Sequence, residues 1–265
     1  SSWEAAYWVH AHRMPVVVHC SHGWDRTSQV AALAQLLLDP YFRTRQGFAC
    51  LVEKDFSAFG HPFHLRCAHG EGRNDNTNSN SGNDGGQIAP IFLQFLDCVY
   101  QLVSLFPECF EFNPKYLLLC SEHVYSCRFG NFLCDSERER EELAGIRQRT
   151  FSIWDYLENE RKEETLNPSY TPERSTGVLL MPFATLMRHV HLWTDRHCMH
   201  SPRLCVRGLP VGVSQPSEPE KYKNDQQSDL FTKRERDVLI AKLHLGVSSS
   251  LPSVEESASF TIDDE

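Results

Sequence analysis

Hydrophobic positions near the start of the chain follow helical spacing first and then form short continuous apolar runs. Residues 1–13 place apolar side chains at helical spacing and lead directly into the β-branched run 15–19, which predicts a helix followed by a buried strand. After a loop at 20–26, the almost wholly apolar stretch 28–38 predicts a buried helix. Helix, strand, loop and helix in this order favour an α/β arrangement.

The second half of the chain carries mainly helical patterns. Over residues 90–106, large apolar side chains recur at the i, i+4 and i+7 positions of one helix face, which predicts a core helix. Further helices are predicted at 114–127, at 152–158 with Ser152 as the capping residue, and at 181–193. We therefore expect the C-terminal half of the fold to be helical.

Two stretches lack the apolar residues that a core requires. Residues at about 71–88 are mostly Asn, Ser, Gly and Asp, so we expect a disordered insertion there. Residues 208–265 are rich in Ser, Pro, Glu, Gln and Lys and are expected to form a low-complexity, largely disordered tail. The remaining residues, 1–207, are expected to form one domain. Because the chain has no start methionine and no strand before 15–19, we expect that it begins within this domain.

Charge and cysteine usage restrict the classes of partner and compartment. With 26 Lys and Arg against 35 Asp and Glu, the formal net charge is -9, and the basic residues form no long cluster, which argues against a nucleic-acid partner. The 10 cysteines include no Cys-x-x-Cys pair, which indicates a reducing, cytoplasmic setting. No apolar stretch approaches the length of a membrane span, so we expect a soluble or peripheral protein.

The sequence HCSHGWDRT at 19–27 carries the chemistry. Five residues separate Cys20 from Arg26, so the chain can curl into a cradle between the strand and the helix. The backbone N–H groups of residues 21–25 can then point inward at the N-terminus of the following helix, where the helix dipole favours an anion. A phosphate group fits such a cradle.

Four side chains of this segment suit phosphoryl transfer. The helix dipole and the charge of Arg26 lower the pKa of Cys20, and the thiolate is the form that attacks phosphorus. Arg26 offers a planar fork to two phosphate oxygens, and the Thr27 hydroxyl can donate to the sulfur. Asp25 can protonate the leaving oxygen and then activate water. The alternative is a buried structural cysteine beside an exposed Asp-Arg pair.

The loop resembles the active-site signature of the myotubularin family of phosphoinositide 3-phosphatases. The resemblance covers roughly residues 1–200 and includes the segments LLLDPYFRTRQGF (36–48), LVEKDFSAFGHPF (51–63), PIFLQFLDCVYQL (90–102), FEFN (110–113), HVYSCRFGNFLCDSERER (123–140) and SIWDYLE (152–158). It implies a cysteine-dependent, tyrosine-phosphatase-like phosphatase fold, with a central sheet flanked by helices and the N-terminal part of the domain missing from this chain. The implied substrates are phosphatidylinositol 3-phosphate and the 3,5-bisphosphate, with no cofactor and no metal.

The resemblance also implies the site residues and the setting. The catalytic residues would be Cys20, Asp25 and Arg26, and substrate contacts would come from Ser21, His22, Gly23, Trp24, Thr27 and Arg66. The protein would work in the cytoplasm, peripherally on endosomal membranes, on a phosphoinositide lipid at the membrane surface. A homo- or heterodimer with another myotubularin is the implied assembly.

The chain departs from the family pattern at two positions. His22 stands where active members usually carry Asp, and Pro62 stands where a basic residue is common. Because Pro62 offers neither charge nor donor to a 5-phosphate, we expect a preference for the 3-monophosphate. His61 and His64 are expected to be surface residues, with a contact to lipid phosphate as the alternative.

Three competing interpretations follow from the residues. A protein tyrosine phosphatase shares the HCxxGxxR[ST] signature, although its separate Trp-Pro-Asp acid loop has no counterpart in this chain. A non-catalytic scaffold that binds an active relative would usually have lost the cysteine or the arginine, and both are present. A zinc site in the His- and Cys-rich stretch 189–205 is disfavoured because its spacing lacks the usual paired ligands.

Overall fold

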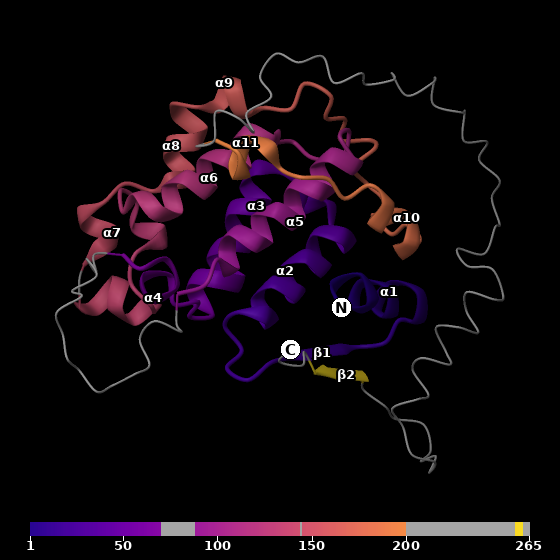
Figure 1. Ribbon diagram of the computed structural model, residues 1–265, viewed down its shortest axis with the longest axis horizontal. Coiled ribbons are helices and arrows are strands. Elements are labelled where there is room, and N and C mark those ends of the chain that lie inside the picture. Colours follow the sequence, from indigo (N-terminus) through magenta and orange to yellow (C-terminus); the bar gives the residue numbers. More distant parts are fainter. Residues whose placement is uncertain (70–87, 144, 200–257, 262–265) are drawn as a thin grey trace, which may run out of the picture. The chain divides into compact units, whose positions relative to one another are not determined.

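The structure is a computed structural model that describes residues 1–69, 88–143, 145–199 and 258–261 (Figure 1). The chain divides into two compact units, Ser1–Leu180 with Ser257–Glu265, and Met181–Glu256. Almost all of the insertion expected at 71–88, and the tail expected at 208–265 apart from one strand, lie outside the described residues. Their expected disorder therefore stays a prediction.

The first unit holds two short strands. β1 (Val16–His19) pairs in parallel with β2 (Ala258–Thr261), with Val16 opposite Ala258. The predicted strand is confirmed, but its expected burial is not observed, because Val17 is 52% exposed and β2 is the only strand beside β1 among the described residues. This pair does not show a central sheet flanked by helices. β2 itself was not expected, since it lies in the segment predicted to be largely disordered.

Helices and helical turns make up the rest of the first half. They are α1 (Ser2–His12), α2 (Arg26–Leu38), the 3-10 turn η1 (Pro40–Arg43), α3 (Arg45–Val52), the π-helix η2 (Glu53–Ala58), α4 (Phe63–Cys67) and α5 (Ile91–Leu105). The predicted helices at 1–13, 28–38 and 90–106 are confirmed. α2 packs against α1, α5 and η2, so the element that follows the cysteine loop lies in the middle of the packing.

The core of this unit is largely aromatic. The ring centroid of Phe95 on α5 lies 6.1 Å from that of Phe48 and 4.8 Å from that of Phe56. Phe92, one turn earlier on α5, lies 5.2 Å from Phe56. All four side chains are at most 2% exposed. Burying each ring contributes about 1.5–3 kcal/mol, so these contacts fix η2 against α5.

Short helices continue the chain to residue 165. They are α6 (Pro114–Ser126), η4 (Gly130–Phe132), the π-helix η5 (Glu139–Leu143), α7 (Ile146–Arg149), α8 (Ile153–Asn159) and α9 (Lys162–Thr165). The side chain of Ser152 accepts a hydrogen bond from the Trp154 backbone N–H at 3.2 Å and caps α8. The predicted helices at 114–127 and 152–158 are thus confirmed, each within one or two residues.

The described part of the second unit corrects one prediction. Instead of a continuous helix over 181–193, the chain forms α10 (Phe183–Arg188) and α11 (Thr194–His197), with an irregular segment between them. Phe183, Met187 and Leu192 are each more than half exposed. Helices this short are marginal in water without a buried apolar face, so the apolar spacing alone does not sustain the longer helix.

None of the described helices combines the length and the apolar character that a membrane-spanning helix requires.

Candidate active site

The cysteine loop connects β1 to α2 and curls back on its own sulfur. Cys20 follows β1 directly, and the backbone N–H of Gly23 donates to the Cys20 Sγ at 3.2 Å. Gly23 has φ +86°, a left-handed conformation that a side chain would strain. Glycine at this position therefore allows the backbone to turn its N–H toward the sulfur, as the sequence predicts for the cradle.

Hydrogen bonding makes Cys20 acidic. Burial acts to raise its pKa, but the Thr27 hydroxyl, the Thr27 backbone and the backbone groups of Gly23 and His22 outweigh that effect and lower the pKa to about 7. The Thr27 hydroxyl is buried and has no other hydrogen-bond partner among the described residues, so it is available to the sulfur. Near neutral pH, about half of the Cys20 side chains are thiolates.

The N-terminus of α2 is left uncapped by the residue best suited to cap it. Asp25 occupies the N-cap position, where a carboxylate usually accepts from the first backbone N–H groups of the helix. Its side chain makes no capping hydrogen bond, and the first turn of α2 carries no acidic residue. No acidic side chain therefore neutralises the positive end of the α2 helix dipole, which favours an anion there.

Asp25 turns instead toward two residues distant in the sequence. Its Oδ1 lies 2.9 Å from His61 Nδ1, and its Oδ2 lies 2.6 Å from Arg66 Nη2. Burial alone would raise the pKa of Asp25, but hydrogen bonds from His61 and Arg66, together with their charge, lower it below the ordinary value of 3.8. In this structure Asp25 is a carboxylate held at two oxygens. The structure thus brings Arg66 to the loop, as predicted, although to Asp25.

The remaining predicted site residues are distributed along the loop. Ser21 is exposed, and Arg26 is half-buried as the first residue of α2. The ring of His22 stacks on that of Trp24, with centroids 5.0 Å apart and the planes 13° apart. His22 thus adds an exposed ring, stacked on the half-buried Trp24, and no carboxylate to the loop.

One expectation for the segment after Gly60 is wrong. His61 is fully buried, so it is neither a surface residue nor positioned for contact with a lipid phosphate. Its burial follows from the neighbouring rings of Phe56 and Phe63, which lie 5.4 and 4.8 Å from it. Pro62 is buried as well, whereas His64 is exposed as expected. Sequence reasoning therefore missed His61 as a partner of Asp25, and the tight turn at Gly60 was the only local signal.

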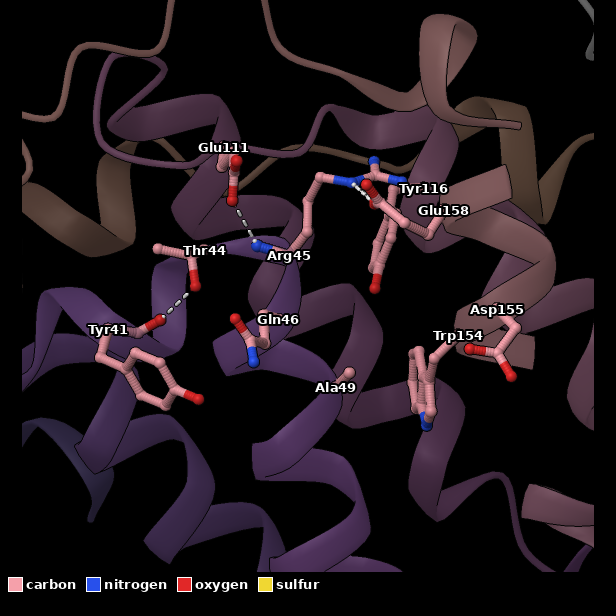
Figure 2. A pocket seen from close by; sticks show the side chains of 10 residues that line it. All are labelled: Tyr41, Thr44, Arg45, Gln46, Ala49, Glu111, Tyr116, Trp154, Asp155 and Glu158. Atoms are coloured by element: carbon pink, nitrogen blue, oxygen red, sulfur yellow. Dashed lines mark hydrogen bonds and ion pairs between the residues drawn. The ribbon is translucent and has the colours of Figure 1, made fainter. Parts of the chain in front are cut away.

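A pocket of about 680 Å³ opens between α3 and α8 (Figure 2). It is lined by Tyr41, Thr44, Arg45, Gln46, Ala49, Glu111, Tyr116, Trp154, Asp155 and Glu158. Arg45 is engaged by Glu158 at 2.9 Å, by the Thr165 hydroxyl at 2.8 Å and by the Leu157 carbonyl at 2.8 Å. These contacts join α3 to α8 and α9, so we assign Arg45 a structural role. None of the loop residues lines this pocket.

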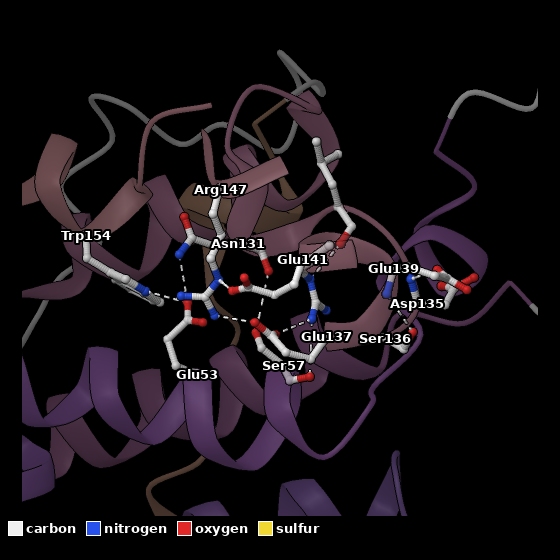
Figure 3. A network of polar contacts seen from close by, with 12 residues as sticks. Glu53, Ser57, Asn131, Asp135, Ser136, Glu137, Glu139, Glu141, Arg147 and Trp154 are labelled. Atoms are coloured by element: carbon white, nitrogen blue, oxygen red, sulfur yellow. Dashed lines mark hydrogen bonds and ion pairs between the residues drawn. The ribbon is translucent and has the colours of Figure 1, made fainter. Parts of the chain in front are cut away.

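A polar network fixes the π-helix η2 that leads to His61 (Figure 3). Glu53 Oε1 accepts from Trp154 Nε1 at 2.7 Å and from Asn131 Nδ2 at 2.8 Å. At the other end of η2, the buried Arg140 donates to the Ser57 carbonyl at 3.3 Å. Both ends of η2 are therefore held by side chains from later in the chain.

The part of the chain that the structure describes contains no candidate metal site. No group of three or more His, Cys, Asp or Glu side chains there is placed to hold a metal ion. Two residues of the His- and Cys-rich stretch, His200 and Cys205, lie outside the described residues.

Comparison with known proteins places the loop in a family. Residues 1–141 match the family described as myotubularin-like phosphatase domain. Phosphatidylinositol-3,5-bisphosphate 3-phosphatase MTMR6 of Mus musculus is 46% identical over 167 residues, which cover 63% of this chain and 25% of that protein. The protein named phosphatidylinositol-3,5-bisphosphate 3-phosphatase MTMR2 of Pongo abelii is 42% identical over 196 residues, 74% of this chain and 28% of that protein. MTMR6 of Homo sapiens is 36% identical over 254 residues, 92% of this chain and 38% of that protein. The chain thus spans well under half the length of these curated relatives.

Proposed function

Because the chain belongs to the myotubularin family, we propose that it is a phosphoinositide 3-phosphatase acting on phosphatidylinositol 3-phosphate or the 3,5-bisphosphate. The observation that carries the proposal is the acidic Cys20 at the uncapped N-terminus of α2. A thiolate beside a helix N-terminus that no acidic side chain caps suits an enzyme that attacks a bound phosphate. The relatives named above are 3-phosphatases of the 3,5-bisphosphate, which supports the substrate class.

We assign the first step to Cys20 and Arg26. The Cys20 thiolate attacks phosphorus, a sulfur–phosphorus bond forms, and the bond from phosphorus to the inositol 3-oxygen breaks. Arg26 and the backbone N–H groups of the loop stabilise the equatorial oxygens of the transferring group. The leaving oxygen takes a proton from Asp25 and departs as the inositol hydroxyl.

The second step hydrolyses the phosphocysteine. Asp25, now a carboxylate, removes a proton from a water molecule, and the resulting hydroxide attacks phosphorus. The sulfur–phosphorus bond breaks, inorganic phosphate is released and the Cys20 thiolate returns, with the Thr27 hydroxyl donating to the sulfur as it leaves.

Asp25 can act as an acid only when its environment changes on binding. In the structure described here Arg66 and His61 hold it as a carboxylate. A phosphate dianion in the cradle opposes that negative charge and draws on the charge of Arg66, and both effects raise the pKa of Asp25. The substrate itself thus prepares its proton donor.

The setting of the enzyme is part of the proposal. A phosphoinositide substrate lies in a membrane surface, so the protein would act peripherally, on endosomal membranes within the cytoplasm. The family resemblance also leads us to propose that the protein forms a dimer with another myotubularin. For the same reason we propose that β1 belongs to a central sheet.

Phosphate release from a panel of soluble short-chain lipids tests the function. The panel contains inositol lipids phosphorylated at the 3-, 4-, 5- and 3,5-positions and a phosphotyrosine peptide. We expect release only from substrates with a 3-phosphate. Cys20→Ser should abolish it, whereas Cys50→Ser, which changes an exposed cysteine on α3, should not. Release from the peptide alone would indicate a tyrosine phosphatase, and no release from any substrate would favour a scaffold.

A further inference from the structure

His61 occupies a position that its packing alone does not explain. The side chain is 0% exposed, and the rings of Phe56 and Phe63 stand edge-on to it, at interplanar angles of 87° and 88°. An apolar residue would fill such a site at lower cost, because a buried polar ring loses its hydration. The structure keeps a histidine whose one engaged nitrogen faces the cysteine loop.

The partners of His61 fix its tautomer. Nδ1 lies 2.9 Å from Asp25 Oδ1 and 3.0 Å from the Trp24 carbonyl oxygen, and both of these atoms accept hydrogen bonds. Nδ1 therefore carries the proton. The opposite nitrogen, Nε2, is buried without a hydrogen-bond partner among the described residues. His61 thus presents a single N–H donor, aimed at two consecutive residues of the loop.

His61 and Arg66 differ in the protonation states of Asp25 with which their hydrogen bonds are compatible. Arg66 is a permanent cation, and it donates to Oδ2 at 2.6 Å and to Oδ1 at the longer distance of 3.3 Å, so it favours the ionised carboxylate and opposes protonation. The Nδ1–H of His61 can donate to a carboxylate oxygen and also to the carbonyl oxygen of a protonated carboxyl group. The His61 contact to Oδ1 can therefore persist through both protonation states that a general acid must pass through.

We propose that His61 is a positioning residue that anchors Oδ1 of Asp25 and leaves Oδ2 as the oxygen that carries the proton. The proposal rests on the proposed function, since it deepens the role of Asp25 in it. Arg66 is 12% exposed and can turn toward a substrate phosphate, whereas the fully buried His61 stays in place.

The support behind His61 suits a fixed donor. The His61 backbone N–H donates to the Phe56 carbonyl at 2.8 Å, which attaches the residue to the end of η2. The network in Figure 3 holds η2 at Glu53 and at Ser57. Because the ring and its backbone are both constrained, the position of the carboxyl group follows from the fold.

Two substitutions of His61 separate positioning from packing. His61→Phe keeps a ring in the aromatic site and removes the donor, whereas His61→Asn can place a side-chain N–H near the position of Nδ1. The readout is kcat/KM on aryl phosphates with activated and unactivated phenol leaving groups, together with the 3-phosphoinositide. Alkylation of Cys20 reports whether the loop is intact.

We expect His61→Phe to lower kcat/KM on the unactivated aryl phosphate and the lipid by about 10-fold to 100-fold, the usual effect of a misplaced catalytic group. The activated aryl phosphate should change by less than about threefold, because its leaving group needs little protonation. His61→Asn should restore most of the loss. In Asp25→Asn, adding His61→Phe should cause no further loss.

Other outcomes overturn the proposal. An equal loss on all leaving groups, an additive loss in the double variant, or slowed Cys20 alkylation in both His61 variants would assign His61 to loop structure alone. If the unmodified protein cleaves aryl phosphates but no inositol lipid, the proposed function fails, and the leaving-group comparison still decides the role of His61.

Discussion

The Thr27 hydroxyl should set the pH at which Cys20 becomes reactive. It makes the largest of the contributions that lower the Cys20 pKa from 9.0 to about 7, and burial works against it. Thr27→Val removes the hydroxyl and keeps the shape of the side chain. The pKa of Cys20 should therefore rise from about 7 toward 9.0.

The size of the effect follows from the thiolate fraction. At about pH 7, a thiol of pKa about 7 is about half ionised, and one of pKa 9.0 is about one per cent ionised. Complete loss of the shift would thus reduce the thiolate about 50-fold. Because the backbone contacts from Thr27 and Gly23 remain, we expect a smaller reduction, of several-fold, at this pH.

Alkylation of Cys20 measures this directly. The protein is treated with iodoacetamide from about pH 5 to about pH 9, and the Cys20 peptide is quantified by mass spectrometry. We expect the midpoint of the rate profile to move upward in Thr27→Val and not in Thr176→Val, which changes an exposed threonine. An unchanged midpoint in Thr27→Val would refute the assignment of the thiolate's stabilisation to this hydroxyl.

Three further predictions concern the charges around the loop. Arg26→Lys should abolish phosphate release while leaving Cys20 alkylation measurable, because a point charge cannot replace the bidentate fork; wild-type kcat would place the clamp elsewhere. Pro62→Arg should raise the ratio of 3,5-bisphosphate to 3-monophosphate kcat/KM, although the burial of Pro62 means that the new side chain must first reach solvent; a constant ratio would separate residue 62 from the 5-phosphate. The ionised Asp25 should stabilise the fold above its ordinary pKa of 3.8, and this stabilisation should be lost as the pH falls through its lower pKa in the folded protein. Asp25→Asn should therefore reduce the free energy of unfolding in urea more at about pH 6 than at about pH 3. Equal reductions at both pH values would contradict the ion-pair account.

The parts of the site that sequence reasoning found are those that lie close together in the chain. Cys20, Gly23 and Thr27 belong to one turn and the start of one helix, so their spacing determines how they meet. The helix α5 was equally easy to predict from the sequence, because its apolar side chains recur at helical spacing over four turns. Local geometry and periodicity are the properties that a single sequence displays.

The partners of Asp25 could be predicted only in part, because they lie far from it in the sequence. Arg66 was expected near the site through resemblance, but its bond to Asp25 depends on how η2 packs against α2 and leads into α4. His61 lies 37 residues from Trp24, whose carbonyl it contacts. No periodicity or motif links such distant residues. The prediction of a continuous helix over 181–193 was wrong for a related reason, since the continuity of a helix depends on packing and not only on apolar spacing.

The hydrogen bonds of Asp25 to His61 and Arg66 affect both the charge at the N-terminus of α2 and the pKa of Asp25 itself. Had its carboxylate capped α2, it would have occupied the helix N-terminus with its own negative charge and competed with phosphate. By bonding His61 and Arg66 instead, Asp25 leaves the positive end of the α2 dipole without a capping carboxylate. The same contacts lower the pKa of Asp25 and keep its carboxyl group ionised in this structure. In the proposed mechanism, a bound phosphate dianion would raise that pKa, so the substrate would prepare its own proton donor.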